Sequence, residues 1–110
     1  MKRKLIALVA ALTMATLVGC SGGAKEAEPA NRLAKVLDSG KLMVGVSPDF
    51  APMEFKDVTK TGDDQYVGSD MAMARYIAKE LGVELEIKAM EFSAIQQAVD
   101  SGTIDCGISG

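Results

Sequence analysis

The sequence contains no histidine and no tryptophan, and only three phenylalanines and two tyrosines among its 110 residues. Without histidine, the chain cannot build a Ser-His-Asp triad or a histidine-ligated zinc site. It also lacks a Cys-x-x-Cys motif and a glycine-rich loop with the spacing that binds phosphate. These absences remove the common catalytic and cofactor motifs, and we expect a protein that is not an enzyme and that holds no metal or cofactor.

Positive charge is scarce in most of the chain. Lys and Arg number 12 against 15 Asp and Glu, for a formal net charge of −3. Three of the basic residues, Lys2, Arg3 and Lys4, stand at the N-terminus, so the chain after them carries nine basic against 15 acidic residues. A negative chain with few aromatic residues lacks the basic surface that nucleic acids require, and we expect no nucleic-acid partner.

The first twenty residues have the pattern of an export signal. The basic residues precede an uncharged apolar stretch, LIALVAALTMATLV, which is too short and wrongly flanked for a stable membrane-spanning helix. The stretch ends in Leu17-Val18-Gly19-Cys20, which resembles the bacterial lipobox. We therefore predict a lipoprotein signal peptide over residues 1–19, lipidation of Cys20, and an extracytoplasmic protein anchored to the membrane by its acyl chains.

The segment after the signal changes in composition. SGGAKEAEPA has no apolar residue larger than alanine, so we predict a flexible tether over residues 20–30. Helix and strand patterns begin at Asn31. Residues 31–110 are therefore predicted to form one folded unit.

Within that unit, helical and strand patterns alternate. Short apolar runs predict strands over residues 41–46, 83–89 and 103–109, separated by single helices, and a hairpin is predicted over residues 55–67. Strands separated by single helices imply right-handed crossovers and a parallel sheet with helices on its faces. We therefore predict an α/β fold. Ligands of such sheets bind beyond the carboxyl ends of the strands.

Capping residues mark the predicted helix ends. The helices are expected to end at Gly40, Gly82 and Gly102. The expected N-caps are Asn31, Ser69 or Asp70, and Ser93, which opens a Ser-x-x-Gln capping box. Met71 and Met73 follow the apolar stripe of the second helix and are assigned to the core. Cys106 is predicted to be a free, buried thiol.

Residues 41–57 (KLMVGVSPDFAPMEFKD) and the stretch from Tyr66 to Gly110 resemble the start of the family 3 extracellular solute-binding proteins, the polar amino-acid receptors of ABC importers. The family's recurring features occur in order: Gly45, Phe50-Ala51-Pro52, Gly68-Ser69-Asp70, Leu81-Gly82, and Asp105 with Gly110. Two positions depart, since Ser69 is usually aromatic and Ala72 usually acidic. The resemblance implies a type II periplasmic-binding-protein-like fold, of which this chain holds the first part of lobe 1.

The resemblance also implies ligand-binding residues. Phe50 matches an aromatic residue that packs on the ligand side chain, and Phe92 matches a second aromatic residue on the opposite wall. Ser109 and Gly110 match strand-end positions that bind the charged backbone groups of the ligand. Ser47 matches a position that is often acidic in receptors for basic amino acids, and its neutral hydroxyl weakens the case for a cationic ligand.

The implied function is capture of a polar amino acid outside the cell and its delivery to a membrane permease. Two alternatives stay open: a surface lipoprotein with a structural or adhesive role, and an extracytoplasmic dehydratase of the same fold. In the family, the position of Gly110 is followed closely by an arginine that grips the ligand α-carboxylate, and members are about twice this length or more. We therefore expect this chain to be a truncated sequence that binds amino acid weakly or not at all by itself.

Overall fold

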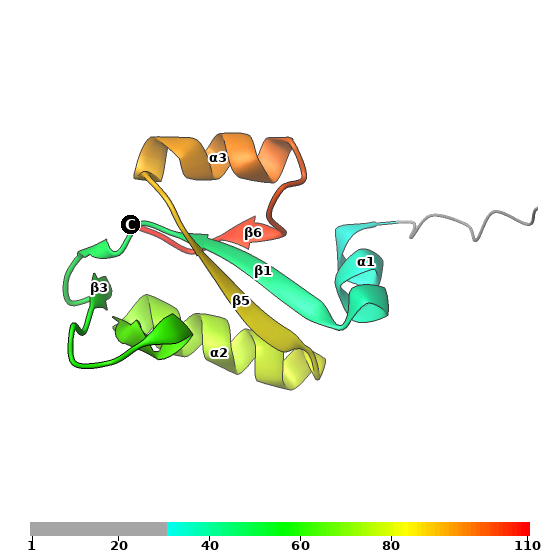
Figure 1. The fold of residues 1–110 in the computed structure, drawn as a ribbon. Coiled ribbons are helices and arrows are strands. Elements are labelled where there is room, and N and C mark those ends of the chain that lie inside the picture. The colour runs from blue at the N-terminus through cyan, green and yellow to red at the C-terminus, as the bar shows by residue number, and fades with distance from the viewer. Residues whose placement is uncertain (1–30) are drawn as a thin grey trace, which may run out of the picture.

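A three-stranded parallel sheet stands at the centre of residues 31–110, the part of the chain that the computed structural model describes (Figure 1). It consists of β1 (Lys41–Val46), β5 (Glu84–Ala89) and β6 (Cys106–Gly107), in the order β5-β1-β6. Val44 pairs with Ile87 on one side and with Cys106 on the other, in parallel register. The predicted parallel α/β architecture is confirmed.

Two helices cover the two faces of this sheet (Figure 1). The crossover from β1 to β5 runs through α2 (Ser69–Leu81), and the crossover from β5 to β6 runs through α3 (Phe92–Asp100). A shorter helix, α1 (Arg32–Ser39), lies beside the beginning of β1. Because α2 and α3 each lead back to the start of a parallel strand, both begin at the rim where the strands end.

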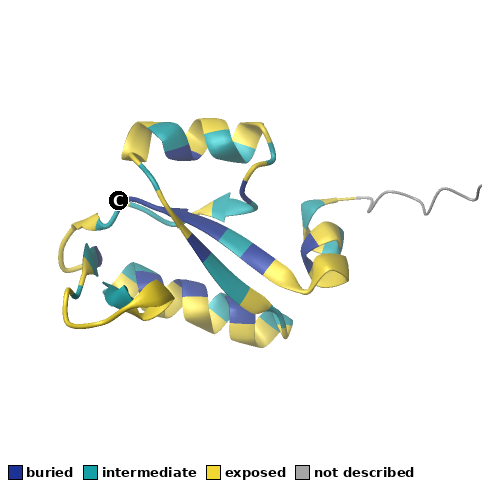
Figure 2. Cartoon of the chain, viewed as in Figure 1, coloured by how far each residue is buried: buried dark blue, intermediate teal, exposed yellow. Residues whose placement is uncertain are grey.

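The core lies between α2 and the sheet, and Figure 2 shows that its buried residues follow β1 and the inner faces of the helices. Val44 and Val46 are completely buried because both faces of β1 are covered. On the α3 side, a Cβ at Gly45 would lie 2.5 Å from Cδ1 of Ile104, so a larger residue at this position would force the buried Ile104 side chain to shift. The main buried cluster consists of Val36, Leu42, Val44, Val46, Met71, Ala74, Ala78 and Ile87.

A small antiparallel sheet lies beyond the carboxyl ends of the central strands (Figure 1). Its strands are β2 (Asp49–Phe50), β3 (Glu54–Lys56) and β4 (Tyr66–Val67), and the short 3₁₀ helix η1 (Gly62–Gln65) precedes β4. The predicted hairpin is therefore confirmed as β3 and β4. The additional strand β2 is short and lies between Pro48 and Pro52, neither of which has a backbone N–H to donate to a longer ladder.

The predicted helix ends are correct where the cap is local in sequence. The side chain of Asn31 accepts a hydrogen bond from the Ala34 amide (2.9 Å), and Gly40 and Gly82 adopt the left-handed conformation at the ends of α1 and α2. The side-chain caps predicted for α2 and α3 are wrong, because α2 follows Gly68 and α3 follows Glu91 without a side-chain cap hydrogen bond.

The physical reason is clear for α2. The Asp70 amide donates to the carbonyl oxygen of Met53 (2.9 Å), so the start of the helix is satisfied by the loop between β2 and β3 and not by a nearby side chain.

At the other end of the chain, β6 is shorter than the predicted strand. Pairing with β1 continues only through hydrogen bonds from Asp105 to Met43 and from Ile108 to Gly45.

Residues 1–30, which include the predicted signal peptide, Cys20 and the tether, lie outside the described residues. Among the helices of residues 31–110, none is long and apolar enough to cross a membrane. Cys106 is a free thiol but is only partly buried, and burial raises its pKa.

Candidate functional site

A cleft of about 410 Å³ opens at the rim where the parallel strands end. Pockets that hold small molecules typically measure about 300–1,000 Å³, so a free amino acid is of suitable size. The cleft is lined by Phe50, Met53, Asp70, Met73, Gly107, Ile108, Ser109 and Gly110. These residues come from β2 and the loop after it, from the beginning of α2, and from β6 with the residues after it.

The topology explains why residues so distant in sequence meet. Strand β6 ends beside the end of β1, and helix α2 begins at the same rim. Phe50 of β2 then lies against the residues after β6, since a Cβ at Gly110 would lie only 3.0 Å from Cε1 of Phe50. The Phe50 side chain is still 44% exposed, so part of its ring remains open to a ligand.

Ser109 and Gly110 form one wall of the cleft. Glu54 lies behind this wall and is completely buried. Its carboxylate accepts hydrogen bonds from the Ser47 amide (3.1 Å), the Gly110 amide (3.3 Å) and the Ser109 hydroxyl. A buried carboxylate is tolerated only when hydrogen bonds replace its lost hydration. Within residues 31–110, no buried side-chain nitrogen or oxygen lacks a partner.

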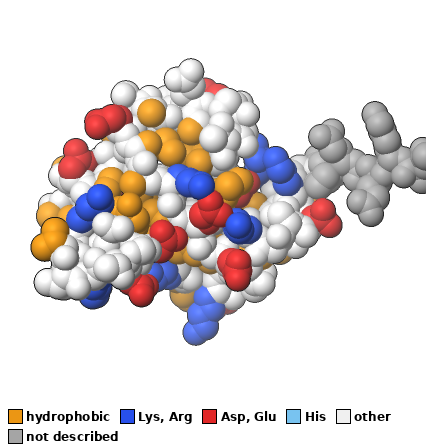
Figure 3. All heavy atoms as spheres, viewed as in Figure 1, with side chains coloured by type: hydrophobic (Ala, Val, Ile, Leu, Met, Phe, Trp, Pro, Cys, Tyr) orange, Lys and Arg blue, Asp and Glu red, His pale blue; other side chains and the backbone are white. Residues whose placement is uncertain are grey.

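The charge at the cleft has one sign. Asp70 lines it, Glu54 lies behind Ser109, and neither Lys nor Arg is among the lining residues. Negative charge and the face of Phe50 both favour a positive group, and an aromatic face adds about 0.5–2 kcal/mol toward a cation. On the face shown in Figure 3, acidic and basic side chains are interspersed and form no patch of one sign.

The structure brings together three of the residues predicted to bind ligand: Phe50, Ser109 and Gly110. Ser47 does not line the cleft. It is 5% exposed, and its hydroxyl donates to Asp49 (2.9 Å) while its amide donates to Glu54. Phe92 is 60% exposed in the first turn of α3 and is also not a lining residue. The ligand-binding roles of all five residues stay predictions.

Sequence reasoning missed two features of the site. Met73 is 48% exposed and lines the cleft, so its assignment to the core is wrong; the face of α2 toward the sheet is formed by Met71, Ala74 and Ala78. Glu54 was not singled out at all. The available signal was an acid between the apolar residues Met53 and Phe55.

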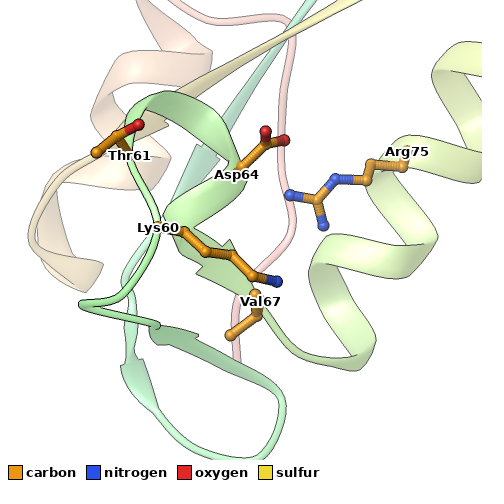
Figure 4. Close-up of a pocket in the computed structure, with 5 residues that line it drawn as sticks. All are labelled: Lys60, Thr61, Asp64, Val67 and Arg75. Carbon is orange, nitrogen blue, oxygen red and sulfur yellow. The ribbon is translucent and has the colours of Figure 1, made fainter.

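A second hollow of about 460 Å³ lies between the hairpin and α2, lined by Lys60, Thr61, Asp64, Val67 and Arg75 (Figure 4). The Arg75 guanidinium donates to the carbonyl oxygens of Asp63 (3.2 Å) and Tyr66 (2.7 Å), which ties the hairpin to the helix. Because its arginine is already engaged, we assign this hollow a structural role. Within residues 31–110, no group of three or more acidic, cysteine or histidine side chains could hold a metal ion.

Comparison with known proteins gives a family match. The family model described as "Bacterial extracellular solute-binding proteins, family 3" matches residues 42–110. The arginine-binding extracellular protein ArtP of Bacillus subtilis is 32% identical over 110 residues, which are 100% of this chain and 38% of that protein. The chain thus spans less than two fifths of the length of this curated relative.

Solved structures support the same family match. The arginine-bound amino-acid ABC transporter substrate-binding protein AbpA of Streptococcus pneumoniae is 47% identical, with a TM-score of 0.63 over 69% of this chain and 32% of that one. The arginine-bound domain 1 of the T. maritima arginine-binding protein is 39% identical, with a TM-score of 0.63 over 69% of this chain and 57% of that domain. The fold is that of type II periplasmic binding proteins, and the chain covers part of lobe 1.

Enzymes also occur among the matches. The membrane-bound lytic murein transglycosylase F of Vibrio cholerae is 36% identical over 95 residues, which are 86% of this chain and 16% of that protein. An ancestral cyclohexadienyl dehydratase is 27% identical, with a TM-score of 0.66 over 74% of this chain and 32% of that one. Similarity to this fold therefore includes both binding proteins and enzymes.

Proposed function

Since the chain belongs to the family 3 bacterial extracellular solute-binding proteins, we propose that it serves to capture a polar amino acid outside the cell for the permease of an ABC importer. The similar proteins named above include an arginine-binding protein and two arginine-bound structures. We propose the same ligand class here, an amino acid with a cationic side chain.

One observation carries this proposal: Phe50, Asp70 and Ser109 converge on a cleft that has no basic residue in its lining. The neutral Ser47 was expected to weaken the case for a cationic ligand. Because Ser47 is buried outside the lining, its neutrality does not decide the charge of the cleft, and Asp70 supplies a carboxylate instead.

We also propose that the protein is a lipoprotein. Residues 1–19 would be its signal peptide, Cys20 its lipidated N-terminus, and residues 20–30 the tether between the membrane and the binding domain. Mass spectrometry of the protein from a bacterial membrane would test this. A diacylated N-terminal cysteine supports it, whereas a mature N-terminus elsewhere, or an unmodified Cys20, contradicts it.

The experiment for the binding function is an NMR titration of the ¹⁵N-labelled full chain, purified in mild detergent, with L-arginine, L-glutamate and a neutral sugar. We expect saturable shifts at Phe50, Asp70 and Ser109 with arginine, at a weak, roughly millimolar dissociation constant, because one lobe alone encloses the ligand incompletely. Equal shifts with glutamate would contradict the proposed ligand class, and the absence of any shift would contradict binding by this chain.

A second candidate, a dehydratase-like enzyme, is favoured by the similarity to the ancestral dehydratase. A dehydratase removes water from a hydroxylated substrate, so ¹H NMR of a hydroxylated amino acid such as L-serine incubated with the chain separates the two: a binding protein leaves its spectrum unchanged over hours, and an enzyme converts it to a dehydrated product. A purely structural or adhesive surface lipoprotein predicts no response to any small solute.

A further inference from the structure

Glu54 is the acid among residues 31–110 that is buried completely, and it lies directly behind the cleft wall. One carboxylate oxygen, Oε1, accepts hydrogen bonds from the Ser109 hydroxyl and the Gly110 amide. The other, Oε2, accepts from the amide of Ser47. The side chain thus joins the chain after β1 to the chain after β6, at the rim where these two central strands end.

These hydrogen bonds determine what the wall can offer a ligand. A hydroxyl has one hydrogen to donate and two lone pairs to accept with. Because Ser109 donates its hydrogen to Glu54, its oxygen can only accept from a ligand in the cleft. The Gly110 amide is likewise directed to Glu54 and is not free to bind a ligand anion.

The rest of the lining has the same character. Asp70 contributes a carboxylate, and no lysine or arginine faces the cleft among its lining residues. A ligand carboxylate would therefore meet acceptors and negative charge at this wall. An ammonium or guanidinium group would meet hydrogen-bond partners and opposite charge.

We propose that Glu54 is a positioning residue of the cleft: it turns the wall formed by Ser109 and Gly110 into an acceptor surface that selects ligand groups with N–H donors and positive charge. The inference rests on the proposed binding function and deepens it. It places the cationic side-chain group of the ligand, and not its carboxylate, against this wall.

A first experiment tests the contacts without any ligand. In the ¹⁵N-labelled full chain, Glu54→Gln replaces one acceptor oxygen by an NH₂ group, so the donors on that oxygen lose their partner. We expect hydrogen exchange of the Ser47 or Gly110 amide to accelerate roughly tenfold, the factor that follows from losing a hydrogen bond to a charged group. The matched control is Glu80→Gln, which removes the same charge from the exposed surface of α2. Unchanged exchange at both amides in Glu54→Gln would overturn the proposal.

A second experiment tests the selection. L-Arginine is compared with L-citrulline, which has nearly the same shape but an uncharged urea group. We expect the wild-type chain to prefer arginine, and both Glu54→Gln and Ser109→Ala to reduce that preference roughly tenfold, since each removes part of one charge-assisted contact. Ser109→Ala changes a partly exposed residue, so it keeps the test decisive if Glu54→Gln does not fold.

The ratio of the two affinities is the useful readout, because loss of folded protein lowers both affinities equally and leaves their ratio unchanged. The double variant should lose no more preference than either single variant, since both act through the same hydroxyl. Equal wild-type affinities, or a preference that survives both variants, would overturn the selection. If the wild-type chain binds none of the amino acids, amino-acid binding by this chain fails, while the exchange experiment still decides whether Glu54 holds the wall.

Discussion

Gly68 lies so close to Met53 that a Cβ at Gly68 would overlap the carbonyl oxygen of Met53. Gly68 also has a φ of +119°, a conformation that side chains other than glycine rarely adopt. The same Met53 oxygen accepts the amide hydrogen of Asp70 (2.9 Å). This contact therefore joins the loop between β2 and β3 to the beginning of α2 and holds Asp70 at the cleft.

Gly68→Ala should consequently damage both stability and the site. Overpacking against backbone, added to the strained φ, should lower the free energy of unfolding by about 3 kcal/mol or more. Gly62→Ala is the matched control, because Gly62 has a φ of +59° with open space around its Cα, and should cost only about 1 kcal/mol. Urea unfolding of the two variants measures the difference, and equal losses would show that the Met53 contact is unimportant.

Phe50 and Phe92 are both exposed aromatic residues, but only Phe50 lines the cleft. We expect Phe50→Ala to weaken arginine binding by about 0.5–2 kcal/mol, the range of a cation–π contact. Phe92→Ala should weaken it less for this chain alone, and Tyr76→Ala, at an exposed position of α2 outside the lining, should leave it unchanged. The NMR titration compares the three variants, and a larger loss for Phe92 than for Phe50 would show that the cleft is wrongly placed.

Asp105 fixes the beginning of β6 to β1 and to α1. Its side chain accepts from the Met43 amide (2.8 Å) and pairs with Arg32 of α1 (3.3 Å), and it is only 4% exposed. Asp105→Asn should destabilise the fold by about 1–3 kcal/mol, because one buried hydrogen bond or the ion pair is lost. Arg32→Ala should cost less, about 1 kcal/mol, since Arg32 is 37% exposed. The control is Asp100→Asn at the exposed end of α3, and thermal unfolding measures all three.

Stability should also depend on acid through Glu86. Hydrogen bonds from Lys88 and Lys41 lower the pKa of Glu86 from 4.5 to about 2. Because the folded state has the lower pKa, this contribution to stability is fully present above pH 4.5 and is lost as the pH falls from 4.5 toward about 2. Glu86→Gln should therefore flatten the fall in urea midpoint between about pH 6 and about pH 3, whereas Glu80→Gln should not. High salt should weaken the effect, because the ion pairs of Glu86 with Lys41 and Lys88 are at the surface.

Local signals predicted much of the fold. Asn31, Gly40 and Gly82 act within one turn of their own helix, so the sequence alone identifies those ends. The N-caps of α2 and α3 could not be identified this way. The amide of Asp70, in the first turn of α2, is satisfied by Met53, 17 residues upstream, and such a partner is visible only after the chain has folded.

The candidate site shows the same limit. Phe50, Ser109 and Gly110 could be placed together, because strand ends of a parallel sheet meet at one rim. Glu54 could not, since an acid in a short strand is usually solvated and its three donors lie 7 to 56 residues away. Met73 lies at the edge of the apolar stripe of α2. Whether a residue at the edge of such a stripe is buried depends on the elements that pack beside the helix, which the sequence does not show.

The reactivity of Cys106 reports whether β6 is held against β1. Burial, and secondarily the charge of Asp105, raises the pKa of its thiol, so less reactive thiolate is present at a given pH. In a Cys20→Ser background, which leaves one thiol in the chain, we expect iodoacetamide to alkylate Cys106 more slowly than a thiol of a short peptide. Urea should abolish the difference. Gly107→Ala, whose Cβ would overlap Cγ2 of Ile95, should loosen the packing of α3 on β6 and raise the alkylation rate without denaturant. If Cys106 instead reacts as fast as the peptide thiol in the native chain, β6 is not held against β1 and the wall of the cleft formed by Ser109 and Gly110 is not preformed.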